Sequence, residues 1–315
     1  MSSVPIPATL QDAIRYFSNM DRCVQTLAAS RWPDGVKCPT CGSAEVRFLA
    51  TRRIWECKSK HPKRQFSVKV GTVFEDSPIG LDKWFTAAWM IANCKNGISS
   101  YEIARDLGVT QKTAWFMLHR IRLAMQTGTF EKASGEFEVD ESFIGGLARN
   151  MHKNKKAKIT GTGGAGKAIV MGLLDRKTKK IRLRHVPNTQ RETLQGVVRD
   201  YIEGGSYVYS DAWVAYTGLD REYIHQVIDH AETYVKGSVH TNGIENFWSL
   251  LKRGLKGTYV SVEPFHLFRY LDEQAFRFNE RKADDSARFL EIMSGVTGRR
   301  VTYQKLTGKE QTAPV

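Results

Sequence analysis

The sequence predicts a mixed α/β fold in which smaller modules precede one sheet flanked by helices. Two observations lead to this class. Short strand-like runs alternate with helical patterns from residue 136 onward, and the region before them holds a cysteine-rich stretch followed by helical repeats of apolar residues. A chain of 315 residues is about twice the length that a single core fills comfortably, so two or three modules are expected.

Charge is the strongest feature of the composition. Lys and Arg total 47 against 33 Asp and Glu, which gives a net charge of +14 and a sequence pI near 9.6. This excess favours a polyanionic partner. A protein that is merely basic, such as one working beside the ribosome, would show the same balance, so charge alone does not decide between the two.

The sequence predicts a soluble, cytoplasmic protein with no membrane partner. No apolar window approaches the roughly 18 residues that span a bilayer, and the start "MSSVPIPATLQDAIRYF" lacks the basic and apolar regions of a signal peptide. Five cysteines are present, and three of them lie within residues 38–57. Such crowding favours a metal site in a reducing compartment over a disulfide framework.

An N-terminal helical segment is predicted over residues 1–33, followed by a zinc ribbon over residues 34–76. Apolar residues recur at helical spacing from residue 8 to 30, and the turn in "RWPDG" ends the pattern. Cys38 and Cys41 then form a CxxC knuckle, and Cys57 and His61 follow after a short hairpin. Three thiolates and one imidazole give tetrahedral Zn²⁺ with no open position, so the role would be structural.

A loop with free thiols is the alternative to this ribbon. The second half-site reads CxxxH, and two complete CxxC pairs would be a stronger signal. Basic residues surround the predicted ligands and suggest that the ribbon touches phosphates: Arg52, Arg53, Lys58, Lys60, Lys63 and Arg64.

Residues 80–128 are predicted to form a helix-turn-helix DNA-binding domain built from three helices. The first is "LDKWFTAAWMIANCKNG", and the second begins at a capping box from Ser99 to Glu102. Gly108 stands where the turn needs a glycine. The recognition helix would begin with Gln111, Lys112 and Thr113. A plain helical hairpin is the alternative, and the neighbouring basic ribbon favours DNA binding.

From residue 134 to 283 the elements follow the order of an RNase H-like domain. The runs "EFEVDESFIGG", "KAIVMGLLD" and "KIRLRHVP" read as strands, and "RETLQGVVRDYI" as a helix. Strands in "GSYVYSDAWVAY" and "YIHQVIDH" and a final helix complete a mixed sheet flanked by helices. Residues 150–167 are predicted to be a mobile basic loop, and residues 284–315 a C-terminal tail.

Two aspartates are predicted to meet on neighbouring strands. Asp140 would end the first strand and Asp211 the fourth, and in this order of elements these two strands are usually adjacent. Two carboxylates at that distance repel each other, so either their pKa is raised or divalent cations neutralise them. Oxygen ligands suit Mg²⁺ in a two-metal site for phosphoryl transfer. Either aspartate alone would more often be structural, so the prediction depends on their coincidence.

The stretch "HTNGIENFWSLLKR" supplies a third acid, Glu245. An apolar stripe marks the core-facing side of the helix, and Glu245 falls on another face with Lys252 two turns along, where a lysine would contact a DNA phosphate. The alternative is a helix cap, in which Asn242 starts the helix and Glu245 folds back onto the backbone. His240 would orient the acid or approach DNA, or else lie on the surface as a capping residue.

Taken in order, the motifs "CPTCG", "SYEIARDLGVTQKTAWFMLHRIR", "EVDESFIGG", "YSDAWVAY" and "HTNGIENFWSLLKR" resemble those of bacterial insertion-sequence transposases of the ISXO type. That family carries an N-terminal zinc ribbon and an RNase H-like DDE catalytic domain, and the resemblance covers roughly residues 8–285. It implies that catalytic Mg²⁺ or Mn²⁺ is held by Asp140, Asp211 and Glu245. Asn242 and Asn246 are alternatives for the third position, and the following lysine of the family falls on Lys252.

The resemblance further implies a DNA transposase that binds the terminal inverted repeats of an insertion sequence. Water would cut the DNA at the transposon end with the help of the bound metal, and the freed 3′-hydroxyl would attack target DNA in line. Lys252, Arg253 and Lys256 would contact the DNA. The implied partners are double-stranded DNA and further copies of the chain, as a homodimer or higher oligomer, in the bacterial cytoplasm and without a nucleotide cofactor.

Two other functions compete with this prediction. The run "GTGGAGKA" at residues 161–168 nearly matches a Walker A loop, but Ala168 stands where a Ser or Thr must bind magnesium, which argues against an ATPase. The other is a non-catalytic DNA-binding regulator that uses the ribbon and the helix-turn-helix. Trp213, beside Asp211, is predicted to be a packing residue, with base stacking as the alternative.

Overall fold

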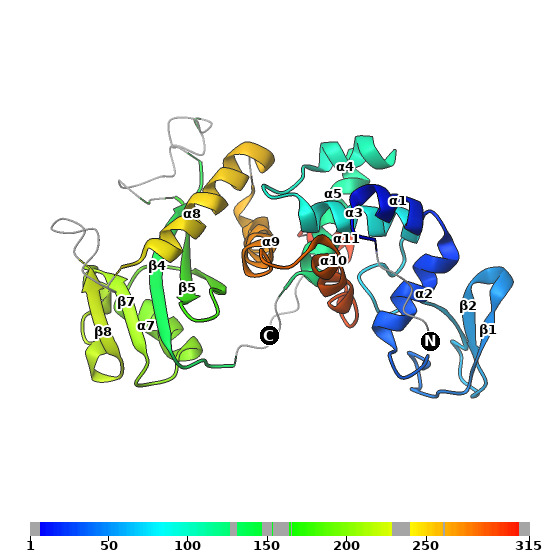
Figure 1. The fold of residues 1–315 in the computed structure, drawn as a ribbon, viewed down its shortest axis with the longest axis horizontal. Coiled ribbons are helices and arrows are strands. Elements are labelled where there is room, and N and C mark those ends of the chain that lie inside the picture. Colours follow the sequence, from blue (N-terminus) through cyan, green and yellow to red (C-terminus); the bar gives the residue numbers. More distant parts are fainter. Residues whose placement is uncertain are drawn as a thin grey trace. The chain divides into compact units, whose positions relative to one another are not determined.

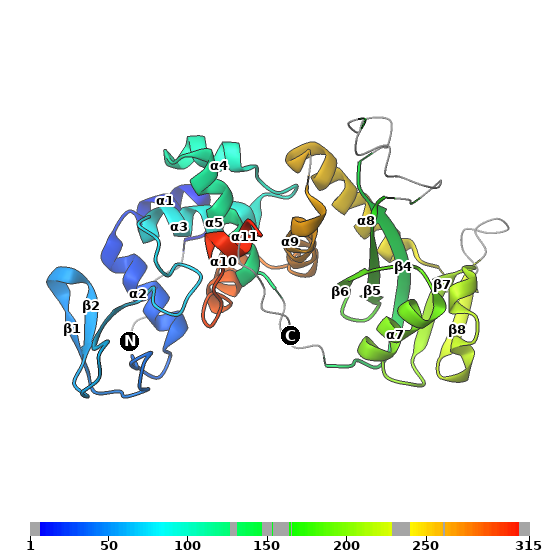
Figure 2. The same cartoon turned by 180° about the vertical axis from the view of Figure 1, so that it is seen from behind.

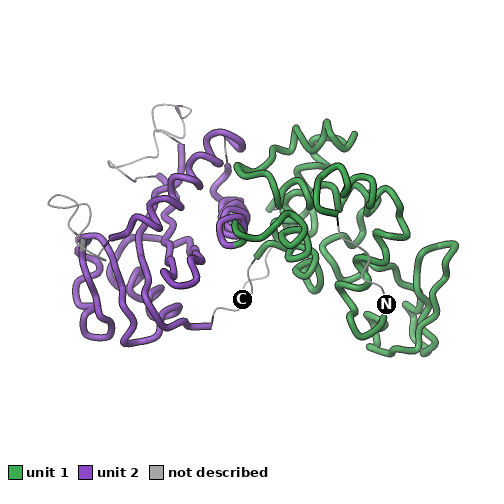
Figure 3. The backbone as a smooth tube through the Cα atoms, in the orientation of Figure 1, with its two compact units in different colours: residues 1–126, 280–315 green, residues 127–279 purple. Residues whose placement is uncertain are grey.

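Two compact units make up the computed structural model, which describes residues 7–126, 131–146, 153, 164, 166–228, 240–260 and 262–308. One unit comprises residues 1–126 together with 280–315, and the other comprises residues 127–279 (Figure 3). Within the described ranges, no helix is long and apolar enough to cross a membrane. The basic loop predicted at residues 150–167 lies mostly outside them.

The N-terminal segment forms two helices, α1 (Leu10–Phe17) and α2 (Met20–Arg31), although its apolar pattern runs on without a break. The break comes from Asn19, whose side chain accepts hydrogen bonds from two backbone amides of α2 and so starts a new helix. Phe17 at the end of α1 is buried against Phe85 and Phe289.

The ribbon is a three-stranded antiparallel sheet of β1 (Val46–Leu49), β2 (Ile54–Cys57) and β3 (Gln65–Ser67), in that order. The short 3-10 turn η1 (Ala50–Arg52) joins β1 to β2, and Arg53 closes it with a φ of 52°. The hairpin predicted between the two halves of the zinc site is therefore present.

Three helices follow, as the sequence predicts: α3 (Leu81–Asn93), α4 (Ser100–Leu107) and α5 (Gln111–Ala124). The capping box between Ser99 and Glu102 starts α4. Gly108 ends α4 with a φ of 59°, a left-handed conformation that glycine adopts at little cost, so the chain turns sharply into α5.

Residues 280–308 belong to the first unit and do not form the separate tail that the sequence predicts for residues 284–315. Helix α10 (Asp285–Ser294) buries Phe289, Ile292 and Met293, which are spaced three and four residues apart and form one apolar face. The short helix α11 (Tyr303–Leu306) follows. The apolar spacing of α10 was visible in the sequence, but the surface it covers, against α3, is fixed by tertiary packing.

The second unit contains a five-stranded mixed sheet in the order β6-β5-β4-β7-β8 (Figures 1 and 2). Its strands are β4 (Glu136–Ile144), β5 (Ala168–Asp175), β6 (Ile181–Val186), β7 (Tyr207–Asp211) and β8 (Ile224–Ile228). Strands β4, β5 and β6 are antiparallel neighbours, while β7 and β8 run parallel to β4. This is the mixed sheet that the order of elements predicts.

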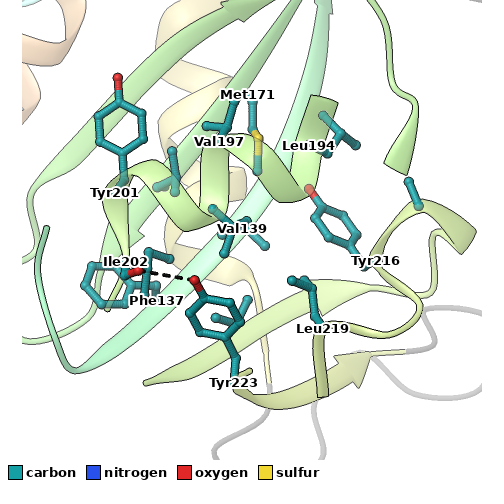
Figure 4. Packing of buried hydrophobic residues seen from close by; sticks show 14 of the residues in the cluster. Phe137, Val139, Met171, Leu194, Val197, Tyr201, Ile202, Tyr216, Leu219 and Tyr223 are labelled. Atoms are coloured by element: carbon teal, nitrogen blue, oxygen red, sulfur yellow. Dashed lines mark hydrogen bonds between the residues drawn. The ribbon is translucent and has the colours of Figure 1, made fainter. Parts of the chain in front are cut away.

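Helices cover both faces of this sheet. Helix α7 (Arg191–Tyr201) and the 3-10 turns η3 (Val214–Tyr216) and η4 (Leu219–Arg221) pack on one face, where Phe137 and Val139 point from β4 (Figure 4). On the same face the Tyr223 hydroxyl donates to the Ile202 carbonyl. The other face carries α8 (Asn242–Gly254) and α9 (Leu267–Asn279). Because side chains alternate along a strand, Glu138 and Asp140 of β4 point toward α8.

Two further segments complete the second unit. Helix α8 continues into the π-helical turn η5 (Leu255–Tyr259), and the 3-10 turn η6 (Pro264–His266) leads into α9.

In the Walker-like run, Lys167 is followed by strand β5 rather than by a helix. A Walker A loop needs a helix N-terminus there to bind phosphate, so the ATPase alternative is not supported.

Candidate functional site

The two predicted aspartates lie at the same level of neighbouring strands. Parallel pairing matches residues 136–138 of β4 with residues 207–209 of β7, and the same offset carried forward aligns Asp140 with Asp211. Asp211 ends β7 as predicted. Asp140 does not end its strand, because β4 continues to Ile144 and stays paired with β5. The alternating pattern that identified the strand extends through Asp140 and gives no signal of an end there.

Glu245 lies in the first turn of α8, on the face of the sheet to which Asp140 points. The charges of the other two carboxylates act on Asp140. Burial raises the pKa of Asp140, and the negative charges of Asp211 and Glu245 add to this effect, so that the pKa reaches about 6 despite a hydrogen bond from the Glu141 amide. Such a site favours either protons or cations.

The described residues contain one group whose metal-ligating atoms all lie within 4.8 Å of one another, and this is the cysteine and histidine set. The carboxylate oxygens of Asp140, Asp211 and Glu245 do not all lie within that distance of one another. A cation bound by all three would therefore require their side chains to approach it.

The structure does not show Glu245 folding back onto the backbone as a helix cap, which is the alternative that the sequence offers. Helix α8 begins at Asn242, its cap residue is Thr241, and no side-chain cap bond is formed there. The Glu245 carboxylate instead accepts a hydrogen bond of 3.0 Å from the Thr241 hydroxyl. Asn242 and Asn246 are both exposed beside it.

The basic end of α8 is open to solvent. Lys252, Arg253 and Lys256 are all exposed, at the last turn of α8 and in η5. Lys252 and Glu245 lie two turns apart on the same helix, as predicted. These three positively charged side chains therefore lie at the C-terminal end of α8 and in η5, whereas Glu245 lies in the first turn of α8.

Trp213 is not the packing residue that the sequence predicts. Trp213 is 51% exposed, and Val214 is 74% exposed. The backbone amide of Trp213 donates to a carboxylate oxygen of Asp211 at 3.2 Å, which ties the exposed ring to the acidic residue. The aromatic residue beside the second aspartate is therefore available for contact with a ligand.

Sequence reasoning missed three residues around the aspartates. The Trp248 indole nitrogen donates to Asp140 Oδ2 at 2.9 Å, and Glu138 accepts a hydrogen bond from the backbone of α8. Glu141 lies on the α7 face, where Tyr216 donates a hydrogen bond to it, and burial together with the charges of Asp140 and Asp211 raises its pKa to about 8. In the sequence Trp248 belongs to an apolar stripe, so no signal marked its polar edge.

The predicted zinc ligands come together in the first unit. The ligand atoms of Cys38, Cys41, Cys57 and His61 lie within 4.8 Å of one another, with Cys38 Sγ 3.4 Å from His61 Nε2 and Cys41 Sγ 3.6 Å from Cys57 Sγ. Burial raises the pKa of Cys38, but hydrogen bonds from the Cys41 and Thr40 amides outweigh it and bring the pKa to about 6. A thiol that ionises this readily is suited to a metal such as Zn²⁺.

The residues predicted to head the recognition helix do begin α5, but each also has an internal contact. Gln111 donates to the Ser100 hydroxyl at 2.8 Å, and the Thr113 amide bonds the capping hydroxyl of Thr110. Lys112 is exposed, with its ammonium 4.8 Å from the ring centre of Tyr303. Lys112 is the member of the three that is best placed to meet a ligand.

The basic residues around the ribbon also include some with an internal contact and others that are exposed. Arg53 is paired with Asp21, and Arg64 donates to the carbonyl of Cys57. Lys58, Lys60 and Lys63 are exposed.

Comparison with known proteins gives matches in both units. The family model of the ISXO2-like transposase domain matches residues 132–279, and that of a transposase zinc-ribbon domain matches residues 18–59. An uncharacterized protein in transposable element ISH50 of Halobacterium salinarum is 28% identical over 258 residues, which cover 77% of this chain and 85% of that protein. An uncharacterized transposase-like protein of Haemophilus influenzae is 36% identical over 95 residues, which cover 30% of this chain and 76% of that protein.

Among solved structures, an intasome of simian T-cell lymphotropic virus in complex with a PP2A regulatory subunit is similar over 55% of this chain, which spans 63% of that chain. The identity is 11% and the TM-score 0.27, and a similarity that low supports no conclusion.

Proposed function

The chain belongs to the ISXO2-like transposase family, and from this premise we propose that it is a DNA transposase that binds the terminal inverted repeats of an insertion sequence and catalyses metal-dependent strand cleavage and strand transfer. The observation that carries the proposal is the alignment of Asp140 with Asp211 on parallel neighbours, under the helix that bears Glu245.

Asp140, Asp211 and Glu245 would hold Mg²⁺ or Mn²⁺. Their fit to such a cation rests on the raised pKa of Asp140, because a buried carboxylate repelled by two others is stabilised when a cation joins them. The bound ions would supply Lewis acidity and a template for in-line displacement at phosphorus. The residues of the chain would align the strands, and Lys252 would hold a phosphate next to the cut.

DNA would be bound by both units. In the first, the exposed Lys112 at the start of α5 would contact the duplex beside Gln111 and Thr113, and the exposed lysines of the ribbon would contact phosphates. In the second, Arg253 and Lys256 extend the cationic surface beyond Lys252. Structural Zn²⁺ held by the cysteine and histidine set would maintain the ribbon.

Trp213 would stack on a base near the cut. The support for this role is that Trp213 is 51% exposed and that its backbone amide donates to Asp211, so its side chain is open to solvent beside the acidic residue. Because joining requires two transposon ends at once, the active form is proposed to be a homodimer or a larger assembly on DNA.

The proposal is tested with purified protein, Mn²⁺ or Mg²⁺, and DNA that carries the terminal repeats of the element. Cleavage or joining is expected, and Asp140→Asn and Asp211→Asn should each abolish it while retaining DNA binding. Asp200→Asn, an exposed aspartate of α7 on the other face of the sheet, is the matched control and should keep full activity. If wild-type protein binds the repeats yet neither cuts nor joins them, the non-catalytic regulator is the correct function.

The third ligand is tested in the same assay. Glu245→Gln should abolish activity, whereas Asn242→Ala and Asn246→Ala should retain it. The reverse result would transfer the role to the asparagine whose replacement is inactive.

A further inference from the structure

Helix α8 is fixed to strand β4 by two polar contacts, one buried and one partly buried, which lie on either side of Glu245 in the sequence. Before it, the backbone amide of Ile244 donates to Glu138 Oε2 at 2.9 Å. After it, the indole nitrogen of Trp248 donates to Asp140 Oδ2 at 2.9 Å. Both β4 acids point toward α8 because they are two residues apart on one strand.

Glu138 is a charged group in the core. It is 1% exposed, and its Oε1 accepts a hydrogen bond of 3.0 Å from Arg176 Nε, which compensates its charge. Its Oε2 satisfies one of the amides that the first turn of a helix leaves unpaired, where a negative charge also interacts favourably with the helix dipole. Arg176 in turn donates to the backbone carbonyl of His240. Glu138 and Arg176 thus fix the chain on both sides of Thr241, the residue whose hydroxyl bonds Glu245.

Trp248 acts directly on the first aspartate. Asp140 Oδ1 accepts from the Glu141 amide at 2.8 Å and Oδ2 from the Trp248 indole, so both oxygens are oriented while each retains a lone pair for another partner. Hydrogen bonds of this kind orient carboxylates that bind metals.

Two glycines make room for these contacts. A Cβ at Gly243 would lie 2.8 Å from Glu138 Oε2 and 2.5 Å from Leu174 Cδ2. A Cβ at Gly172, which pairs with Asp140 across β4 and β5, would lie 2.9 Å from Trp248 Cζ2. Helix and sheet can therefore approach this closely only because both positions lack a side chain.

We propose that Glu138 and Trp248 are positioning residues that set the placement of Glu245 relative to Asp140 for binding a divalent cation. The inference rests on the proposed function, since it presumes that these carboxylates hold the cation. Neither residue touches substrate. Glu138 acts through the backbone of α8, and Trp248 acts through the Asp140 carboxylate.

The first test compares two glutamates of β4 that share one arginine. Glu138→Gln should weaken Mn²⁺ binding about 10- to 100-fold, measured by electron paramagnetic resonance on the full chain without DNA. It should also speed hydrogen exchange at the first amides of α8. Glu136→Gln is the matched control, because Glu136 lies 3.7 Å from Arg176 and is 51% exposed. Equal effects of the two variants, or unchanged Mn²⁺ binding in Glu138→Gln, would overturn the role of Glu138.

The second test keeps an aromatic ring at position 248 and removes its N–H group. Trp248→Phe should weaken Mn²⁺ binding about tenfold or more, and it should raise the Mn²⁺ concentration needed for half-maximal DNA cleavage while changing the rate at saturating Mn²⁺ much less. Phe247→Leu, at the neighbouring buried position of α8, removes packing without removing a hydrogen bond. If it weakens Mn²⁺ binding as much as Trp248→Phe does, the role of Trp248 is only structural.

Failure of the inference and failure of the proposed function give different results. If wild-type protein binds Mn²⁺, Asp140→Asn abolishes the binding, and the Glu138 and Trp248 variants bind normally, only the positioning roles are wrong. If Asp140→Asn leaves Mn²⁺ binding unchanged, or if wild-type protein does not bind Mn²⁺, the proposed metal site is wrong. The positioning roles are then wrong as well, because they presume that site.

Discussion

Asp140 and Glu141 are adjacent in the chain but point to opposite faces of the sheet, and both are held in a state that favours protonation. Burial is the first cause in each case, and neighbouring carboxylates add to it, giving pKa values of about 6 and about 8. Asp140 faces α8 and the proposed cation, whereas Glu141 accepts a hydrogen bond from the buried Tyr216. A cation beside Asp140 would replace the proton there, which links metal binding to pH.

The raised pKa of Asp140 predicts how metal-free protein responds to pH. The folded state holds this proton more tightly than the unfolded chain, where the pKa is near 3.8, so the free energy of unfolding falls as pH rises from about 4 through about 6. The shift corresponds to at most about 3 kcal/mol. Asp140→Asn should therefore be more stable than wild type at pH 8 by up to that amount and no more stable at pH 4, in urea unfolding without added Mg²⁺ or Mn²⁺.

Added Mg²⁺ should narrow the difference at pH 8, because it stabilises the wild-type carboxylates and not the variant. Asp200→Asn, at an exposed position of α7, serves as the control for replacing an aspartate by asparagine. A stability difference that is the same at pH 4 and pH 8 would contradict the assigned cause.

At the scale of single residues, the sequence predicts where the proposed ligands lie better than it predicts the residues that contact them. Asp140 and Asp211 stand out because acids are unusual in apolar strands, and their alignment follows once the two strands pair in parallel. The contacts of Glu138 and Trp248 depend on how α8 lies across the sheet, which is decided by packing over Gly172 and is not encoded in any short motif. The sequence also gives no sign that Trp213 is exposed, because tryptophan as a residue type is more often buried.

At the scale of elements, the ribbon is the part whose shape depends most on a few side chains. Its strands are three and four residues long, and the aromatic contact of Trp55 with Phe66 and with Phe48 supplies a small core. Sheets of this size are marginal without further support, and a metal site can provide it. The cysteine and histidine set is thus expected to stabilise the fold of residues 34–76.

Replacement of one ligand should therefore remove both zinc and structure. Cys57→Ser is expected to lower the zinc content from about one ion per chain to near zero, by mass spectrometry of metals, and to expose the ribbon to proteolysis. Cys94→Ser changes a cysteine outside the ligand group and should leave both properties intact. Full zinc content in Cys57→Ser would show that this cysteine is not a ligand.

Elements were predictable where a local signal marked their ends. The capping box at Ser99 and the glycine at residue 108 mark α4 in the sequence, and alternation marks the strands of the second unit. The break between α1 and α2 is harder to predict, because one asparagine interrupts a continuous apolar pattern. An apolar pattern reports which face is buried and carries no information about a cap inside it.

At the scale of the whole molecule, the chain leaves the first unit after residue 126 and returns to it at residue 280. The sequence patterns predict modules that follow one another along the chain, and they therefore predict a tail for residues 284–315. Figure 3 shows that the last described residues belong to the same unit as the first. The backbone amide of Val73 bonds the carbonyl of Val296, and the core around Phe17 includes Phe289. The first unit is therefore complete only after the second has been synthesised.

This division predicts that a single residue of α10 supports the fold of the N-terminal unit. Phe289 is fully buried and contacts Phe17, Phe85 and Trp89, so Phe289→Ala leaves a cavity among their rings and should cost about 3–5 kcal/mol of unfolding free energy. Leu290, the next residue, is 36% exposed, and Leu290→Ala should cost less than about 1 kcal/mol. Chemical unfolding measures both. Similar small losses in the two variants would mean that residues 284–315 are a dispensable tail after all, whereas a large loss confined to Phe289→Ala would make α10 part of the N-terminal core.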